Sequence, residues 1–438
     1  MKPSHAATPD DDWLLRTCTE QLIYVPGRLS SLTTYVMLEQ EQWFETEIGF
    51  VSRLLEPDTD VLDIGANHGV YTLALAQGMS SGRVWAFEPT AEPRARLEST
   101  VQANGLAERV TVVPCALSDR TGRARFYTSA QSELNSLQAV GGAGHEDVDV
   151  DTLDAFAARH LGGRTAGFVK IDAEGEELRV LQGGRAWFEH SPAIVMFELM
   201  HGNCVQFELL AAFQARGYGV FRHLPGLDLL SEVNPGNASD NDWLLNLFAV
   251  KPAQQERLAR LGLLVRADDL ATAAEVPDPQ MMEALQRLAA SAPMQDLALP
   301  FGDDESPEYV MALAHAATAQ LGLAAGPVQR LQHLMAARDG VQLALNAGRV
   351  SDVVRGRCSC TACTRWAIAV RRCAWPVNSC NTGRSSARKA RFSCRCWRVN
   401  WGVRAPATPP AGCARPWLNS SKCDAAIHPS SPTTRRVP

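Results

Sequence analysis

Short apolar runs alternate with stretches of helical spacing through the middle of this chain. Each run holds four to eight residues and predicts a strand, while apolar residues three or four positions apart predict the helices between them. The run from Ala193 to Leu199 (AIVMFEL) is apolar almost throughout, as in a strand covered on both faces of a sheet. Residues 128–147, which are rich in Gly, Ser and Gln, predict a long loop. The predicted strands are 61–64, 84–87, 110–117, 167–171, 193–199, 218–222 and 243–250.

Strands that alternate with helices predict an α/β fold with a mostly parallel sheet. Residues 1–52 form a lead-in with a helix that begins near Trp43, and residues 53–252 form the α/β domain. Residues 253–350 are rich in Ala, Leu and Gln at helical spacing and predict an α-helical accessory segment. No period of 34 residues persists there, so a tetratricopeptide-type repeat is not supported. Residues 351–438 form a tail of different composition.

Charge and cysteine content distinguish this tail from the rest of the chain. The protein has 438 residues and a formal net charge of −6, yet residues 351–438 hold 16 of its 42 basic residues, two of its 48 acidic residues and nine of its 12 cysteines. Irregular cysteine spacing and a single remote histidine, His428, argue against a zinc module, and isolated arginines match no nucleic-acid-binding motif. We interpret the tail as frame-shifted or disordered, because a one-base shift turns GC-rich codons for Ala and Leu into codons for Arg, Trp and Cys.

The remaining sequence predicts a globular protein of a reducing compartment. Hydrophobic residues make up 46% of the chain, but no apolar run approaches the roughly 18–20 residues of a membrane span. Residues 1–12 are polar and acidic, and they contain no apolar signal core. Only three cysteines precede the tail, which suits a reduced environment. These features predict a cytoplasmic protein without a membrane span.

A glycine turn follows the first predicted strand. The sequence VLDIGANHGVYT, from Val61 to Thr72, passes from an apolar strand through Gly65 and Gly69 into helical spacing. At the carboxyl edge of a parallel sheet such a turn presents backbone N–H groups to a ligand, and glycine lets the ligand approach closely. Asp63 adds a carboxylate, which favours an ammonium group over a pyrophosphate. A purely structural turn is the alternative, because one glycine turn is weak evidence.

An acidic residue at the tip of the second strand strengthens the prediction of a nucleoside site. Glu88 lies 23 residues after Gly65, where βαβ nucleotide sites bind ribose hydroxyls. The turn reads GANHG and lacks the GxGxxG pattern of dinucleotide sites. Together these features favour S-adenosylmethionine over a nicotinamide dinucleotide. The alternatives are an NAD-dependent enzyme and a non-catalytic nucleoside-binding module or truncated gene product.

The chain resembles the FkbM-type S-adenosylmethionine-dependent methyltransferase family in an ordered set of motifs. They are VLDIGANHGVYT (61–72), AFEP (86–89), VVPCALSDRTGRARF (112–126), VDTLDAF (150–156), VKIDAEGEELRVLQGG (169–184) and IVMFEL (194–199). The resemblance implies a Rossmann-like class I methyltransferase sheet. It also implies an enzyme that O-methylates a hydroxyl of a small-molecule or glycan acceptor. We expect no nucleic-acid partner. The cofactor-binding residues that it implies are Asp63, Gly65, Asn67, Gly69 and Glu88. Backbone groups near Ala116 would contact the adenine, since the acid that many class I enzymes place there is missing.

An acidic cluster follows the fourth predicted strand, near the expected position of the methyl donor. Methyl transfer to an alcohol requires a positioned hydroxyl and removal of its proton, and we predict Asp172 and Glu174 as the catalytic residues. One alternative is that these carboxylates hold Mg²⁺, which would lower the pKa of the hydroxyl. Another is that Glu174 and Glu176 only stabilise the first turn of the next helix. Glu198 would face the same cleft, and Lys170 would pair with a neighbouring carboxylate.

Overall fold

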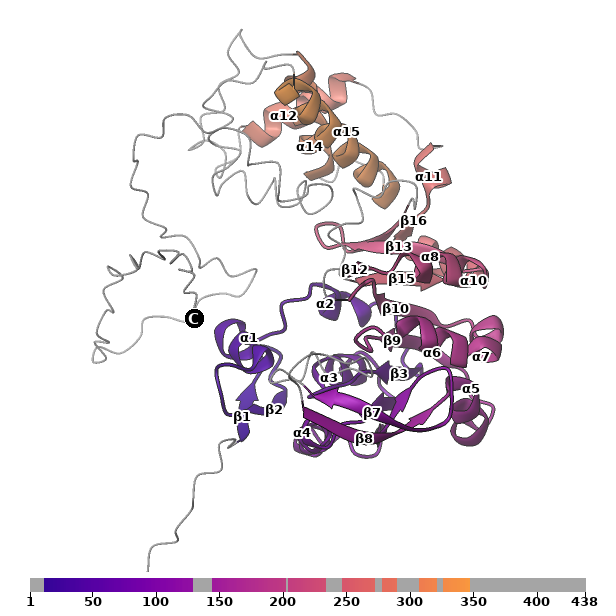
Figure 1. The fold of residues 1–438 in the computed structure, drawn as a ribbon. Helices are drawn as coiled ribbons and strands as arrows, with labels where there is room; N and C mark the ends of the chain where they lie inside the picture. The colour runs from indigo at the N-terminus through magenta and orange to yellow at the C-terminus, as the bar shows by residue number, and fades with distance from the viewer. Residues whose placement is uncertain are drawn as a thin grey trace, which may run out of the picture. The chain divides into compact units, whose positions relative to one another are not determined.

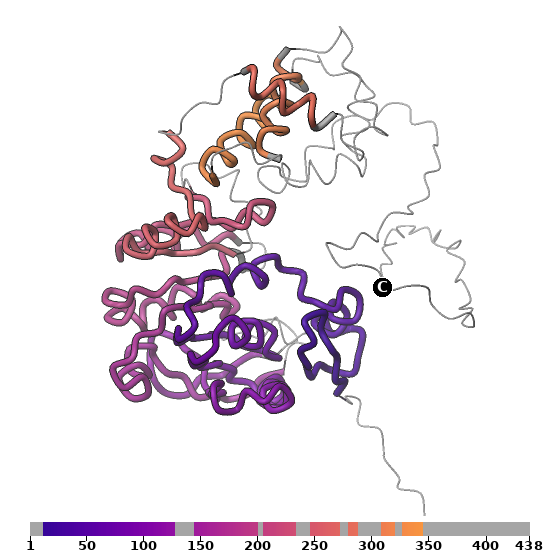
Figure 2. Tube along the Cα trace, turned by 180° about the vertical axis from the view of Figure 1, so that it is seen from behind, coloured from indigo at the N-terminus to yellow at the C-terminus, as the bar shows by residue number. Residues whose placement is uncertain are grey.

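The computed structural model describes residues 12–128, 144–201, 204–233, 246–271, 278–289, 307–320 and 326–346. Figure 1 labels their helices and strands, and Figure 2 shows the same trace from behind. All of these residues belong to one compact unit, residues 1–385. The second unit, residues 386–438, lies outside the described residues, as does the whole of the predicted tail.

A nine-stranded sheet forms the centre of this unit (Figure 1). Its strands are β3 (Asp60–Ile64), β4 (Val84–Phe87), β5 (Val110–Val113), β9 (Ala166–Ile171), β10 (Ile194–Glu198), β13 (Gly219–Leu224), β14 (Leu229–Glu232), β15 (Asn246–Val250) and β16 (Leu264–Val265). They follow the order β16-β14-β13-β15-β10-β9-β3-β4-β5. The five strands from β10 to β5 are parallel, and β15 runs antiparallel to both of its neighbours. The predicted α/β fold with a parallel-rich sheet is therefore confirmed.

Helices cover both faces of the sheet. On β3, Leu62 and Ile64 belong to one buried apolar cluster, whereas Val61 belongs to the other. The first cluster includes residues of α5 (Leu153–Phe156), α6 (Glu177–Gly183), α7 (Arg185–His190) and α8 (Phe207–Gln214). The second includes residues of α2 (Glu47–Val51), α3 (Val70–Gln77), α4 (Ala91–Ala103) and α10 (Pro252–Arg260). Strands β3 and β4 are buried along their whole length, and a strand covered on both faces is nearly continuously apolar in sequence.

A second, three-stranded sheet has the order β6-β8-β7. Its strands are β6 (Cys115–Leu117), β7 (Gly122–Thr128) and β8 (Gly144–Asp151). The prediction of a single strand over 110–117 is therefore wrong, because the chain leaves β5 and enters β6 at Pro114, which has no N–H to donate. Strand β8 also begins inside the predicted loop 128–147, of which residues 129–143 lie outside the described part of the chain.

The N-terminal residues form a hairpin and two helices. These elements are β1 (Asp12–Arg16), β2 (Leu22–Pro26), α1 (Leu32–Gln40) and α2. The backbone N–H of Leu22 donates to Asn104 Oδ1 just beyond α4, at 3.0 Å. The backbone N–H of Tyr24 donates to Thr100 Oγ1 on α4, also at 3.0 Å. The lead-in is therefore joined to the α/β domain, and the helix predicted from Trp43 is limited to α2.

The described residues after residue 252 are mainly helical. Their helices are α10, α11 (Ala267–Ala271), α12 (Asp278–Ala289), α14 (Pro307–Gln320) and α15 (Pro327–Asn346). Met281, Leu313 and Ala317 belong to an apolar cluster of this segment. The short strand β16 lies in the same stretch and adds to the central sheet by pairing with β14. None of the helices in the described ranges is long and apolar enough to cross a bilayer.

Two glycines offer a matched test of how closely the β3 turn approaches β9. Both have positive φ, +79° at Gly65 and +67° at Gly105, but a Cβ at Gly65 would lie 1.8 Å from the Asp172 carbonyl oxygen, whereas one at Gly105 would meet nothing within 4 Å. Gly105→Ala should cost about 1–2 kcal/mol for the left-handed backbone alone. Gly65→Ala should cost about 1–3 kcal/mol more, because the strand ends must separate. Urea unfolding measures both losses, and equal losses would contradict this account.

Candidate active site

A cavity of about 270 Å³ lies at the carboxyl ends of β3, β4, β9 and β10. Ligands of open α/β sheets bind at this edge. The lining includes the turn after β3, the tip of β4, strand β6 and the loop after β9. Residues from these elements are Gly65 to His68, Glu88, Pro89, Cys115 to Leu117, Asp172 to Glu174 and Glu176. Glu198 and the N-terminal residues Leu32, Thr33 and Trp43 to Glu45 complete the wall.

The glycine turn is bonded to the neighbouring strand β4. The backbone N–H groups of Gly65 and Ala66 both donate to the Phe87 carbonyl, at 3.2 and 3.0 Å. Asn67 has a positive φ of 47°, an uncommon conformation for a residue other than glycine. Its backbone N–H donates to Glu88 Oε2 at 3.0 Å. The turn after β3 and the tip of β4 therefore form one hydrogen-bonded unit.

Glu88 is a buried carboxylate, 6% exposed, whose orientation is fixed by three hydrogen bonds. Besides the bond from Asn67, its Oε1 accepts from the Thr90 backbone N–H at 2.9 Å and from the Thr90 hydroxyl at 2.5 Å. Burial raises the pKa of Glu88, and these hydrogen bonds oppose that shift. A carboxylate has about four acceptor positions, so Glu88 keeps capacity for a ligand hydroxyl in the cavity.

Lys170 on β9 places a buried ammonium group beneath the cavity. Its Nζ donates to Asp172 Oδ2 at 2.9 Å and to the Gly65 carbonyl at 3.5 Å, and it lies 3.9 Å from Asp63 Oδ1. Burial alone would lower the pKa of Lys170, but the Asp172 and Asp63 carboxylates outweigh it and raise the pKa. The ammonium also lies 5.0 Å from the centre of the Tyr71 ring, within reach of a cation–π interaction. The predicted pairing of Lys170 with a neighbouring carboxylate is confirmed.

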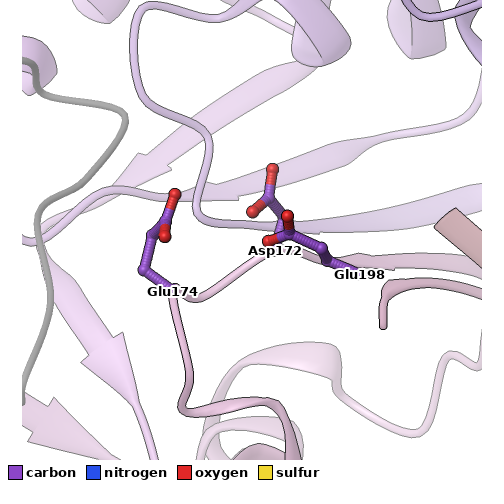
Figure 3. Close-up of side chains that lie close together, drawn as sticks. All are labelled: Asp172, Glu174 and Glu198. Atoms are coloured by element: carbon purple, nitrogen blue, oxygen red, sulfur yellow. The ribbon is translucent and has the colours of Figure 1, made fainter. Parts of the chain in front are cut away.

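Three carboxyl groups converge in the cavity (Figure 3). Asp172, Glu174 and Glu198 each present an oxygen, and these oxygens all lie within 4.8 Å of one another. Glu174 has a positive φ of 50°, and such strain in a residue other than glycine is frequent at functional sites. Burial raises the pKa of Glu198 far above its ordinary value, and repulsion from Asp172 and Glu174 adds to this effect. These effects favour the protonated form of Glu198, which shares a hydrogen bond with Asp172.

The carboxylate that holds the loop after β9 is Glu177, not Glu174 or Glu176. Glu177 Oε1 accepts from the backbone N–H groups of Ala173 and Gly175, at 2.9 and 3.2 Å. Its Oε2 accepts from Gln206 Nε2 at 2.9 Å. Ala173 and Gly175 precede α6, so the alternative in which Glu174 and Glu176 only stabilise the first turn of that helix stays a prediction.

Six of the eight predicted site residues line the cavity, namely Gly65, Asn67, Glu88, Ala116, Asp172 and Glu174. The other two, Asp63 and Gly69, lie behind its wall. Asp63 is fully buried and accepts from the Thr72 hydroxyl at 2.5 Å, so its placement does not support direct contact with an ammonium group of a ligand. Gly69 permits packing of α3 against α4, because a Cβ there would lie 2.7 Å from Leu97 Cδ1.

Two residues that the sequence did not single out also shape the site. Glu177 follows the predicted acidic pair within DAEGEE, and its hydrogen bonds to the loop distinguish it from Glu176, which is buried as well. Glu45 accepts hydrogen bonds from Trp43, Tyr71 and Asn246. No local pattern indicates this role, because Asn246 is 201 residues away along the chain.

A family model and two curated relatives are similar to part of this chain. Residues 63–220 match the model of the methyltransferase FkbM domain. The chain is 33% identical over 161 residues to the 31-O-demethyl-FK506 methyltransferase FkbM of Streptomyces tacrolimicus, covering 30% of this chain and 60% of that protein. It is 27% identical over 152 residues to the 2-O-methyltransferase NoeI of Sinorhizobium fredii, covering 31% of this chain and 61% of that protein. The chain thus spans about three fifths of the length of both curated relatives.

A solved structure is also similar to this chain. It is the crystal structure of a methyltransferase FkbM from Methylobacillus flagellatus. The two chains are 21% identical, the comparison covers 47% of each, and the TM-score is 0.33.

The raised pKa of Glu198 predicts how stability changes with pH. The pKa of Glu198 is higher in the folded protein than in the unfolded protein. The stabilisation from its bound proton is therefore complete below the ordinary pKa of 4.5, and it is lost as the pH rises toward the pKa of the folded protein. Glu198→Gln cannot lose a proton there, so its free energy of unfolding should exceed that of the wild type increasingly from about pH 5 to 8, by up to about 1.4 kcal/mol per pH unit. Urea unfolding at several pH values tests this. The exposed Glu208→Gln on α8 is the control, and parallel curves for all three proteins would refute the prediction.

Proposed function

We propose that this chain, whose residues 63–220 match the model of the methyltransferase FkbM domain, transfers a methyl group from S-adenosylmethionine to a hydroxyl of a small-molecule or glycan acceptor. The observation that carries the proposal is that one cavity joins the glycine turn and Glu88 to the three-carboxylate cluster. The similarity to the 2-O-methyltransferase NoeI and to the 31-O-demethyl-FK506 methyltransferase FkbM supports a hydroxyl oxygen as the acceptor atom. The match to a methyltransferase domain favours methyl transfer over the NAD-dependent alternative.

The cofactor half of the cavity suits a nucleoside. Glu88, oriented by Asn67 and Thr90, offers an acceptor position to ribose hydroxyls. The wall at Ala116 is apolar and suits the adenine ring. Burial raises the pKa of the neighbouring Cys115 to about 12, so this thiol stays protonated and takes no part as a nucleophile. When bound, S-adenosylmethionine supplies an electrophilic methyl group, which passes to the acceptor oxygen as the C–S bond breaks and the C–O bond forms.

Asp172 is the residue that we assign as the general base. Its carboxylate lies in the cavity, and Lys170 holds one of its oxygens at 2.9 Å, which fixes the orientation of the group. The proton of the acceptor hydroxyl moves to Asp172 as the oxygen attacks. Glu174 lies within the same cluster and positions the hydroxyl. Asp172 and Glu174 contribute to catalysis mainly by holding the acceptor hydroxyl in line with the methyl group.

A divalent cation is the second candidate for this step. The spacing of the three carboxylates within 4.8 Å favours it, since oxygen ligands of this kind suit Mg²⁺. A cation would require Glu198 to release its proton, which its raised pKa opposes at neutral pH. Metal binding would therefore strengthen as the pH rises. The general-base mechanism and the metal mechanism differ in whether EDTA abolishes turnover.

Removing the Glu88 carboxylate tests the cofactor site. Glu88→Ala should weaken binding of S-adenosylhomocysteine by about 1–3 kcal/mol, because charge-assisted hydrogen bonds to the ribose are lost. Calorimetric titration of the full chain measures this, with NADH as the ligand that should not bind. Glu98→Ala, an exposed position on α4, is the matched control. A folded Glu88→Ala protein with wild-type affinity would remove Glu88 from the cofactor site.

Removing the negative charge of Asp172 tests the chemistry. Asp172→Asn should lower turnover on the order of 10²-fold or more while leaving affinity for S-adenosylhomocysteine nearly unchanged, as expected for a general base. The assay follows labelled methyl groups from S-adenosylmethionine onto a panel of sugars and hydroxylated natural products. Asp149→Asn on β8 is the control, because that side chain is 73% exposed. Wild-type turnover in Asp172→Asn would refute the assignment, and inhibition of the wild type by EDTA would favour the metal version.

A further inference from the structure

We propose that Leu32, Trp43 and Phe44, together termed the N-terminal wall, form the acceptor-recognition surface of the cavity and select acceptors with an apolar ring or aliphatic group beside the reacting hydroxyl. This inference rests on the proposed methyl transfer. It goes further by assigning a substrate class and a binding surface to residues that precede the family domain, which begins at residue 63.

The N-terminal wall and the carboxylate cluster line the same cavity. Leu32, at the start of α1, and the pair Trp43–Phe44 share the lining with Asp172 and Glu198. The Trp43 and Phe44 rings contact one another, with their centres 4.8 Å apart. Phe44 is 45% exposed and Leu32 is 39% exposed, so substantial apolar surface of both is available. A ligand that bridges the cavity would meet carboxylates at one end and this apolar surface at the other.

Polar bonds fix the wall to the body of the enzyme. The Glu45 carboxylate accepts from the Trp43 indole N–H at 2.8 Å and from the Tyr71 hydroxyl at 2.6 Å. It also accepts from Asn246 Nδ2 on β15 at 2.7 Å. Glu45 thus orients Trp43, which also packs against the buried apolar cluster that includes Phe50 and Val51. A rigid, partly exposed aromatic surface loses little conformational freedom when an apolar group covers it.

The wall is also linked to the chemistry of the site. Tyr71, which donates to Glu45, carries on its ring face the ammonium group of Lys170 at 5.0 Å. Lys170 in turn holds Asp172 at 2.9 Å. The position of the wall and the position of the proposed base are therefore set by one continuous chain of contacts. An acceptor held against the wall has a defined distance to Asp172.

The chemistry of the wall favours one kind of acceptor. Leu32 has no polar group to offer a sugar hydroxyl, and covering it with apolar surface removes water from both partners. Ligand pockets commonly combine such apolar walls with a few placed polar groups that orient the ligand. The carboxylates then recognise the hydroxyl, and the N-terminal wall recognises the apolar group attached to the same molecule.

Two glycosides with identical hydroxyls test this division. Binding of phenyl β-D-glucoside and methyl β-D-glucoside to the full chain is measured by ligand-observed NMR, with and without S-adenosylhomocysteine. The phenyl compound should bind about tenfold more tightly, the gain expected for burying part of an aromatic ring. Leu32→Ala and Phe44→Ala should each remove most of this preference. Leu38→Ala is the matched control, because Leu38 is an apolar residue of α1 that is 44% exposed and does not line the cavity.

The outcomes separate this inference from the proposed function. Affinity for S-adenosylhomocysteine should be the same in all four proteins. Equal affinity for the two glycosides, binding of neither, or an unchanged preference in Leu32→Ala and Phe44→Ala would overturn the inference while leaving cofactor binding intact. Failure of the wild type to bind S-adenosylhomocysteine would instead refute the proposed function, whatever the glycosides show.

Discussion

The buried ammonium group of Lys170 is the interaction on which the rest of the site depends. A charge enclosed in a protein is tolerated only when opposite charges and hydrogen bonds compensate for lost hydration. Asp172 and Asp63 supply that compensation from two adjacent parallel strands, at 2.9 and 3.9 Å. The Gly65 carbonyl supplies a further acceptor, and the absence of a side chain at Gly65 lets the strand ends approach. The glycine turn and the proposed base are therefore positioned by the same charge.

The surplus of carboxylates around this single ammonium group explains the state of Glu198. Asp63 and Asp172 already balance Lys170, so a further ionised carboxylate at the end of β10 would face only like charges. Keeping Glu198 protonated relieves that repulsion and allows it to donate to Asp172. A bound cation would relieve the same repulsion by binding the ionised carboxylates. Because the carboxylates outnumber the ammonium group, the site suits either a bound proton or a bound metal ion.

The fold was predictable wherever burial on both faces of a strand leaves a continuous apolar run, as in β3, β9 and β10. The β6-β8-β7 sheet was not, because Pro114 interrupts an otherwise uniform run and the charged alternation of β8 resembles a loop. At the site, Glu88 and Asp172 were found because each ends a strand. The position of Asp63 behind the cavity wall was not predictable, because the sequence does not show that Thr72 and Lys170 enclose it. The role of Glu45 could not be predicted from the sequence, because its hydrogen-bond partners come together only in the folded chain.

The cavity also divides according to the origin of its walls. The glycine turn, Glu88 and Asp172 lie within residues 63–220, which match the methyltransferase FkbM domain, and they line the part of the cavity that we propose for the cofactor and the base. The N-terminal wall lies before these residues and lines the part of the cavity that we propose for the acceptor. Leu32 and Phe44 can change without breaking the bonds that Glu45 accepts from Trp43, Tyr71 and Asn246, because neither side chain takes part in them. Acceptor choice can therefore vary while the chemistry at Asp172 is preserved.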